Sequence, residues 1–215
     1  MEDVKRPYVA PVRIEQAAET RRRILDAAAG AFISKGWVGT TLADVARAAG
    51  VTPQAVHLSV GAKPDLLMAA LRRAVAGDFA DVPLMEREPF RTAYAEGTTL
   101  TERAAAFAAG SRGVYARAGQ LFLVLAQAAP AHPAVADLWD DARSARLNDC
   151  RRLVEMVLGR RKKTLVDRST DVLFVISGPG VYADFVGDRH WQNDSYERWL
   201  STTIEMSLTT TSIVS

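Results

Sequence analysis

The stretch TTLADVARAAGVTPQAVHLSVGAKPDLL, residues 40–67, decides the fold of the first part of the chain. The hydroxyl of Thr41 can cap a short helix, which Gly50 then breaks. A second helix starts at once, because Thr52 can cap it and Pro53 stands at the first helical position, where proline is tolerated. Two short helices joined by a tight glycine turn are typical of a helix-turn-helix, in which the first helix braces the second.

The composition of the chain is that of an ordinary soluble protein. It has 215 residues, of which 48% are apolar and 24% charged. The net charge is only +2, so affinity for nucleic acid has to come from a local patch. The single cysteine, Cys150, cannot form an internal disulfide and suits a reducing compartment. The N-terminus has no secretory h-region, and the apolar run at residues 121–126 is too short for a bilayer, so we expect a cytoplasmic protein.

Helical periodicity runs through the rest of the chain, and no strand pattern of any length interrupts it. The sequence therefore predicts an all-α fold of about nine or ten helices. We expect a flexible N-terminal arm at 1–13, a small helical unit with the helix-turn-helix at 14–65, and a larger helical unit at 66–215; the family resemblance described next implies that the first is the DNA-binding domain and the second the effector-binding and dimerisation domain. The first helix is expected to stop at Gly36. Beyond the head, helices are expected from 64, from about 99, and at 121–129, 134–159, 165–177 and 193–208, with a loop at 81–98. Gly110 and Gly113 lie inside one of these helices, where small residues let another group approach closely.

The head of the chain resembles a known family. ILDAAAGAFISKGWVGTTLADVARAAGVTPQAVHLSVGAKPDLL is similar to the DNA-binding domain of the TetR family of bacterial transcriptional regulators. The later segments DLWDDARSARLNDCRRLVEMVLG and DVLFVISGPGVYADFVGDRHWQNDSYERWLSTTI resemble the regulatory domain of one large branch of that family. The resemblance implies a homodimer, acting as a repressor, that binds a near-palindromic DNA operator and is released by a small-molecule effector.

The resemblance and the residue chemistry together indicate which side chains meet DNA. Helix N-termini at Thr41 and Thr52 offer backbone N–H groups to phosphate oxygens. Gln54 suits an adenine edge, and His57 can donate to a phosphate or to guanine. Lys63 and the arginines of the first helix form a positive edge. The candidate DNA-contacting residues are Arg21, Arg22, Thr41, Thr52, Gln54, Ala55, His57, Leu58 and Lys63.

The sequence departs from the family pattern at the second short helix. Many members end that helix with Thr or Ile, then Tyr, Tyr or His, and Phe, whereas this chain has AVHLSV at residues 55–60. His57 stands where a tyrosine is usual, and Ala62 stands where a serine often caps the fourth helix. The operator sequence therefore does not carry over from the family.

The family resemblance also implies an effector cavity between helices of the second domain. Apolar pockets between helices are the usual form of such sites, although residues at helical spacing are more often plain core. Arg112 or Arg143 is a candidate polar group for the effector. The full candidate set is Phe107, Arg112, Tyr115, Phe122, Trp139, Arg143, Met156 and Phe174.

Apolar stripes on the helices at 165–177 and 193–208 suggest a dimer interface. A lone subunit would expose these faces, and two copies packed about a twofold axis would bury them in a four-helix interface. The candidate interface residues are Leu173, Ile176, Tyr196, Leu200, Ile204 and Leu208.

Other chemistries find little support in the sequence. Asp137, Asp140 and Asp141 with His132, or His190 with nearby acids, could suggest a metal, but acids in the first turns of a helix are expected without one. No nucleophile–base pair, phosphate loop or dinucleotide fingerprint stands out, so we expect no enzyme activity, no metal and no cofactor. The alternative function is a helical small-molecule-binding or protein-interaction module whose head no longer reads DNA.

Overall fold

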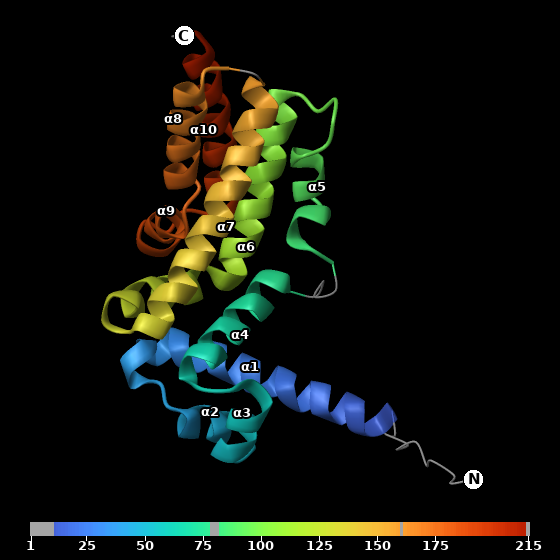
Figure 1. Cartoon of the computed structure of the whole chain (residues 1–215), viewed down its shortest axis with the longest axis vertical. Helices are drawn as coiled ribbons and strands as arrows, with labels where there is room; N and C mark the ends of the chain where they lie inside the picture. Colours follow the sequence, from blue (N-terminus) through green and yellow to red (C-terminus); the bar gives the residue numbers. More distant parts are fainter. Residues whose placement is uncertain (1–10, 78–81, 160, 214–215) are drawn as a thin grey trace, which may run out of the picture. The chain divides into compact units, whose positions relative to one another are not determined.

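A computed structural model describes residues 11–77, 82–159 and 161–213 of the chain. Over these residues every regular element is a helix, which confirms the all-α prediction (Figure 1). The chain divides into two compact units, Met1–Ala70 and Leu71–Ser215. This division falls a few residues after the boundary at 65/66 expected from the sequence, inside one continuous helix.

The first unit is built from α1 (Pro11–Gly39), α2 (Leu42–Ala49), α3 (Pro53–Val60) and the first residues of α4 (Lys63–Ala76). Residues 11–13, expected in the arm, are already helical, because proline is compatible with the first turn of a helix. The rest of the expected arm, residues 1–10, lies outside the described residues. Gly36 interrupts α1 with φ 67° and ψ −174°, close to the predicted stop, and a last short turn follows it.

The core of the first unit joins its helices through apolar side chains at helical spacing. Ile24 and Phe32 of α1, Val45 of α2, and Val56 of α3 have about none of their surface exposed. Since each of the two short helices contributes a buried valine to the core that α1 supplies, neither has to be stable alone.

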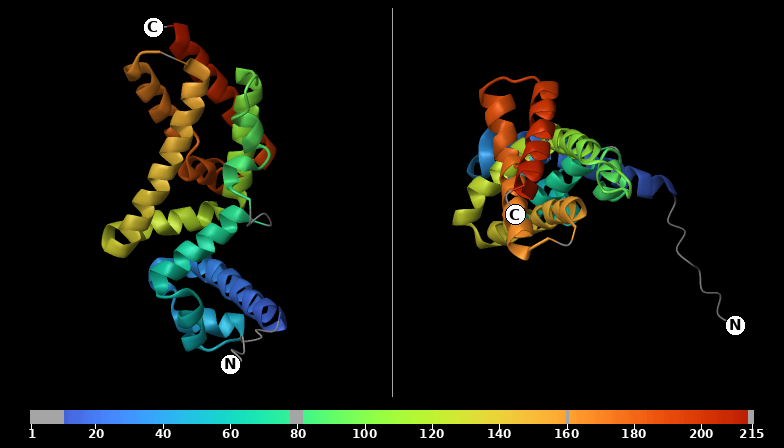
Figure 2. Two further views of the ribbon diagram at one scale, coloured as in Figure 1. Left: turned by 45° about the vertical axis from the view of Figure 1, so that its right-hand side comes forward. Right: turned by 90° about the horizontal axis from the view of Figure 1, so that it is seen from above.

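The second unit contains the remaining helices. They are η1 (Leu84–Glu86), α5 (Phe90–Ala93), α6 (Leu100–Ala128), η2 (Ala129–Ala131), α7 (Pro133–Leu158), α8 (Lys163–Ile176), α9 (Pro179–Tyr182), the π-helical η3 (Ala183–Asp188) and α10 (Asn193–Ile213). In this unit α10 packs against α6 and α8, and α7 packs against α8. Figure 2 shows α7, α8 and α10 lying side by side.

Helix α6 corrects one prediction and confirms another. The sequence suggests a separate helix at 121–129, but α6 continues to Ala128 without a break. Glycine residues favour the end of a helix only weakly, so tertiary packing determines where α6 ends. A Cβ atom on Gly110 would lie 2.6 Å from the ring of Phe90, so only glycine fits there. This is the close approach that the small residues predict.

Candidate nucleic-acid interface

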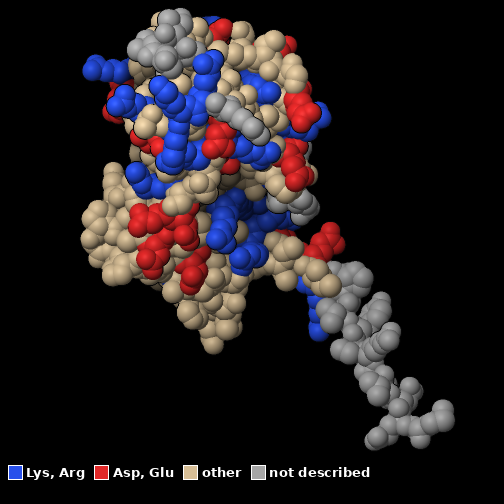
Figure 3. All heavy atoms as spheres, turned by 45° about the horizontal axis from the view of Figure 1, so that its top comes forward, with Lys and Arg blue, Asp and Glu red and all other residues tan. Residues whose placement is uncertain are grey.

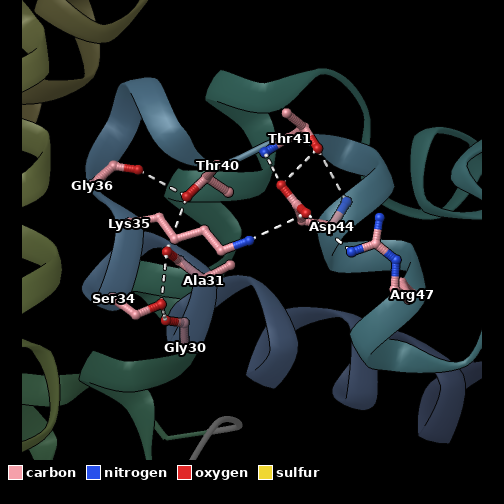
Figure 4. Close-up of polar contacts among 9 residues, drawn as sticks. All are labelled: Gly30, Ala31, Ser34, Lys35, Gly36, Thr40, Thr41, Asp44 and Arg47. Atoms are coloured by element: carbon pink, nitrogen blue, oxygen red, sulfur yellow. Dashed lines mark hydrogen bonds and ion pairs between the residues drawn. The ribbon is translucent and has the colours of Figure 1, made fainter.

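The start of α2 is fixed by a reciprocal capping box. The backbone N–H of Asp44 donates to the hydroxyl oxygen of Thr41 at 3.1 Å, and the backbone N–H of Thr41 donates to the Asp44 carboxylate at 3.3 Å. Figure 4 shows Lys35 and Arg47 reaching the same carboxylate, at 3.2 and 3.4 Å. Hydrogen bonds from Thr41 and from Lys35 hold the pKa of Asp44 below its ordinary value.

A buried hydroxyl ties this helix start to the end of α1. Thr40 has about none of its surface exposed, and its Oγ1 lies 3.0 Å from the carbonyl oxygen of Ala31 and 2.8 Å from that of Gly36 (Figure 4). Its hydroxyl therefore bridges the turn before Gly36 and the turn after it. Thr40 is not among the site residues predicted from the sequence, although a polar residue directly before a capping box is a signal that could have found it.

The turn between α2 and α3 follows the predicted chemistry. Gly50 has the left-handed conformation, with φ 68° and ψ 39°, which a glycine adopts without strain. Its N–H donates to the carbonyl of Arg47, and the N–H of Val51 donates to that of Ala46, so the end of α2 is a Schellman motif. The hydroxyl of Thr52 then accepts the N–H of Ala55 at 3.1 Å and starts α3.

Helix α3 exposes the side chains that the sequence assigns to DNA. Thr52, Gln54 and His57 are exposed, and Leu58 has 78% of its surface exposed. Ala55 is partly covered. The polar and apolar groups on the outer face of α3 are therefore available to a ligand, while its inner face belongs to the core.

The basic residues predicted to contact phosphate all have partners inside the first unit. The guanidinium of Arg21 donates to the carbonyl of Ser59 at the end of α3, and Arg22 pairs with Glu19 one turn earlier in α1. The Lys63 ammonium lies 4.5 Å from the centre of the Trp37 ring. Partial burial lowers the pKa of Lys63.

The residues predicted to line an effector cavity lie in several separate environments. Phe107 packs edge-on against Phe90, with ring centres 5.9 Å apart. Tyr115 is buried and donates from its hydroxyl to the carbonyl of Ser177 at 2.8 Å, and burial raises its pKa to about 12. Phe122 meets the Tyr115 ring edge-on at 6.1 Å.

The other candidate cavity residues also contact their own chain. Arg143 lies 5.5 Å from the centre of the Trp139 ring and 5.2 Å from that of Phe174, so these three come together. Arg112 forms an ion pair with Glu197, with 2.9 Å between Nε and Oε2. The sulfur of Met156 lies 3.9 Å from a buried arginine, Arg103. An effector role for this set stays a prediction.

The apolar stripe predicted for a dimer interface is mostly covered within the chain. Five of its members have at most about 2% of their surface exposed, and Ile176 is partly covered. The premise that a lone subunit exposes this stripe is wrong, because α6 and α8 cover the inner face of α10. The covered residues are Leu173, Tyr196, Leu200, Ile204 and Leu208. Apolar side chains that do remain exposed on α8 and α10 are Val172, Val175 and Met206.

In the part of the chain that the structure describes, no three His, Cys, Asp or Glu side chains gather as a metal site would require. Among the described helices, none combines the length and the apolar character needed to cross a bilayer. Basic and acidic side chains are both present on the face drawn in Figure 3, and neither sign covers it alone.

Comparison with known proteins places the helix-turn-helix in a family. The family described as "Bacterial regulatory proteins, tetR family" matches residues 24–70. The HTH-type transcriptional regulator TtgR of Pseudomonas putida is 46% identical over 57 residues, which are 26% of this chain and 27% of TtgR. SrpR, another such regulator from Pseudomonas putida, is 45% identical over 56 residues, or 26% of each chain. These matches therefore span about a quarter of each relative.

The fold is shared over a greater length. The crystal structure of NalD, the secondary repressor of the MexAB-OprM multidrug efflux pump in Pseudomonas aeruginosa, covers 89% of this chain. The match takes in 96% of NalD with a TM-score of 0.68 and 18% identity, so it shows a common fold. TtgR and SrpR are described as transcriptional regulators, and NalD as a repressor. Residues 24–70 therefore match the TetR family of bacterial regulatory proteins, and the longer structural matches show a shared fold.

Proposed function

We propose that the chain is a dimeric, cytoplasmic transcriptional repressor that binds an inverted repeat of DNA through α3 and is released by a small-molecule effector. One observation carries this proposal: α3 presents Gln54, His57 and Leu58 on the open face of a helix that is capped at its start and fixed from behind by Val56. A rigid helix with an exposed polar head is what the major groove accepts.

The groups on α3 suit direct contact with base edges. The amide of Gln54 can accept from N6 and donate to N7 of adenine. Leu58 offers an apolar surface to a thymine methyl group, and His57 can donate to guanine or to a phosphate. The N–H groups at the starts of α2 and α3 add phosphate contacts, which set the register of the protein on the duplex.

Phosphate contacts by the basic residues require an exchange of partners. Arg22 is paired with Glu19, and Arg47 shares the Asp44 carboxylate with Lys35. These pairs are exposed and worth little in water, so a phosphate can compete for the cations. Each phosphate neutralised releases counterions, so binding should weaken as salt rises, with a slope of about 0.9 per contact on logarithmic axes.

A second copy of the chain would use the outer faces of α8 and α10. Val172 has 46% of its surface exposed, Val175 63% and Met206 64%. Two such faces related by a twofold axis would place two α3 helices on equivalent half-sites, which is why the operator should be an inverted repeat. An effector would act by binding the two states of this dimer with different affinity.

The experiment is selection of bound duplexes from a random DNA library at two salt concentrations. We expect an inverted repeat to be enriched, with affinity falling steeply with salt. The double variant Gln54→Ala, His57→Ala should lose the enrichment, and the matched control Gln120→Ala, Gln127→Ala, in exposed glutamines of α6, should keep it. A folded dimer that enriches no sequence would overturn the proposal and leave the alternative of a small-molecule or protein-interaction module.

A further inference from the structure

A cavity in the second unit lies beside the end of α4, and none of the aromatic residues predicted for an effector lines it. It has a volume of about 210 Å³ and is formed by the end of α4, residues 84–90 and one side of α6. Phe90, Val114, Gly110 and Gly113 supply much of its apolar wall. At Gly113 helix α6 brings no side chain to the cavity, and at Gly110 the Phe90 ring takes the space of a side chain.

Arg117 of α6 brings a cation into the wall of this cavity. Its Nε donates to the carbonyl of Ala74 and one terminal nitrogen donates to that of Val75, both at 3.1 Å. The other terminal nitrogen, Nη1, lies 3.8 Å from the position of a Cβ atom on Gly113. Within the described residues no carboxylate forms an ion pair with Arg117. An arginine has five N–H donors, so this guanidinium has donors left after binding two carbonyls.

The combination of an apolar wall and Arg117 defines a ligand chemistry. The wall also carries Arg87 and Glu88, and the Glu88 carboxylate is already bound by Arg91 and Thr92. A flat apolar body would lie against Phe90 and against α6 at Gly113, and a carboxylate would pair with Arg117 in the fork geometry that arginine favours. We propose that this cavity binds a small aromatic carboxylate. The inference deepens the function proposed above and rests on it only in naming this compound class as the effector.

Arg117 also connects the cavity to the end of α4. The carbonyls that Arg117 holds are those of the last turn of α4, whose first residues belong to the helix-turn-helix unit. A carboxylate bound to the remaining donors of Arg117 would therefore lie next to the turn of α4 that Arg117 holds.

The test is direct calorimetric titration of the full chain with benzoate and with benzamide, its neutral counterpart. We expect benzoate to bind and benzamide to bind about tenfold more weakly or not at all, because only benzoate carries the charge. Arg117→Gln should weaken benzoate binding about tenfold or more. Gly113→Leu should abolish it by filling the cavity while leaving the arginine in place. Arg161→Gln, in an exposed arginine between α7 and α8, should leave binding within about twofold of the unchanged chain.

Thermal melts of each variant show whether it folds, and DNA selection is scored separately. Benzoate and benzamide binding equally would overturn the inference, as would benzoate binding that survives both Arg117→Gln and Gly113→Leu. So would the absence of heat up to about 10 mM benzoate. If benzoate binds as expected but no DNA is enriched, the cavity stands and the regulator proposal fails. If DNA is enriched but benzoate does not bind as expected, the cavity inference fails and the regulator proposal stands.

Discussion

Arg103 lies buried in α6 with its guanidinium directed at backbone carbonyls. It donates to the carbonyls of Ala93 at 2.6 Å, Ala95 at 2.7 Å and Thr98 at 3.1 Å. A lysine has the same charge but no planar fork, so Arg103→Lys would leave carbonyls unpaired. We expect a loss of about 2–4 kcal/mol in the free energy of unfolding, measured with urea. Arg91→Lys, in an exposed ion pair with Glu88, should change it by less than about 0.5 kcal/mol, and equal losses would contradict the prediction.

Thr40 gives a second test at the scale of one residue. Thr40→Val keeps the shape of the side chain but removes the hydroxyl that lies between the carbonyls of Ala31 and Gly36. We expect the free energy of unfolding to fall by about 1–2 kcal/mol, because the part-buried carbonyls of Ala31 and Gly36 lose a donor. The control is Ser34→Ala, which removes an exposed hydroxyl that bonds to the carbonyl of Gly30 and, at a longer distance, to that of Ala31. A neutral Thr40→Val would mean that this tether contributes nothing.

Asp44 predicts a pH dependence with a definite sign. Its folded pKa lies below the ordinary value of 3.8, so the carboxylate stabilises the fold fully above about pH 4 and this contribution is lost as the pH falls through the folded pKa. Asp44→Asn lacks a titrating group. The difference in stability between the two chains should therefore shrink below pH 4, as measured by urea unfolding at several pH values. A difference that stays constant across this range would refute the assignment.

At the scale of elements, the start of α4 shows half of a capping box. The backbone N–H of Ala62 donates to the Asp65 carboxylate at 2.9 Å, but alanine has no hydroxyl to return a bond to the helix N–H groups. Ala62→Ser should therefore raise the free energy of unfolding by about 0.5–2 kcal/mol. Ala105→Ser, at an exposed position inside α6, should instead lower it slightly. Thermal and urea unfolding measure both, and a destabilised Ala62→Ser would contradict the capping argument.

The ends of α2 and α3 could be predicted because local chemistry sets them. Thr41, Gly50 and Thr52 act on backbone groups within a few residues, and the sequence shows each directly. The extent of α6 could not be predicted in this way. The sequence places Gly110 inside a helix, but it does not show that the Phe90 ring, from a segment expected to be a loop, packs against this glycine. That contact joins segments that the sequence alone does not bring together.

At the scale of the whole molecule, the exposed apolar residues of α8 give the dimer a test. Val175→Glu would place a charge in the proposed interface and should convert the dimer to monomer, as measured by sedimentation. The control is Val38→Glu, because Val38 has 87% of its surface exposed but lies in the first unit. If Val175→Glu remains a dimer, the two copies meet elsewhere.

The predicted interface stripe shows that an apolar pattern indicates a buried face but not which chain covers it. Leu200, Ile204 and Leu208 recur at helical spacing, which correctly indicates a buried face. The pattern does not say whether that face is covered by the same chain or by another. For α10 the cover is α6 and α8 of the same chain, and periodicity carries no information on this choice. The exposed head of α3 was predictable because the turn chemistry fixes which face lies inward.

Three arginines of the second unit donate hydrogen bonds to backbone carbonyls: Arg87, Arg103 and Arg117. Every residue has a backbone carbonyl whatever its side chain. The residues whose carbonyls accept from these arginines can therefore be substituted, whereas the arginines cannot. Partly exposed residues such as Val75 and Ala95 can drift under mutation without losing the bond that fastens them. The three arginines cannot drift, even to lysine. In this unit, substitutions of the three donor arginines should therefore be tolerated poorly, and substitutions of the residues whose carbonyls they bind should be tolerated well.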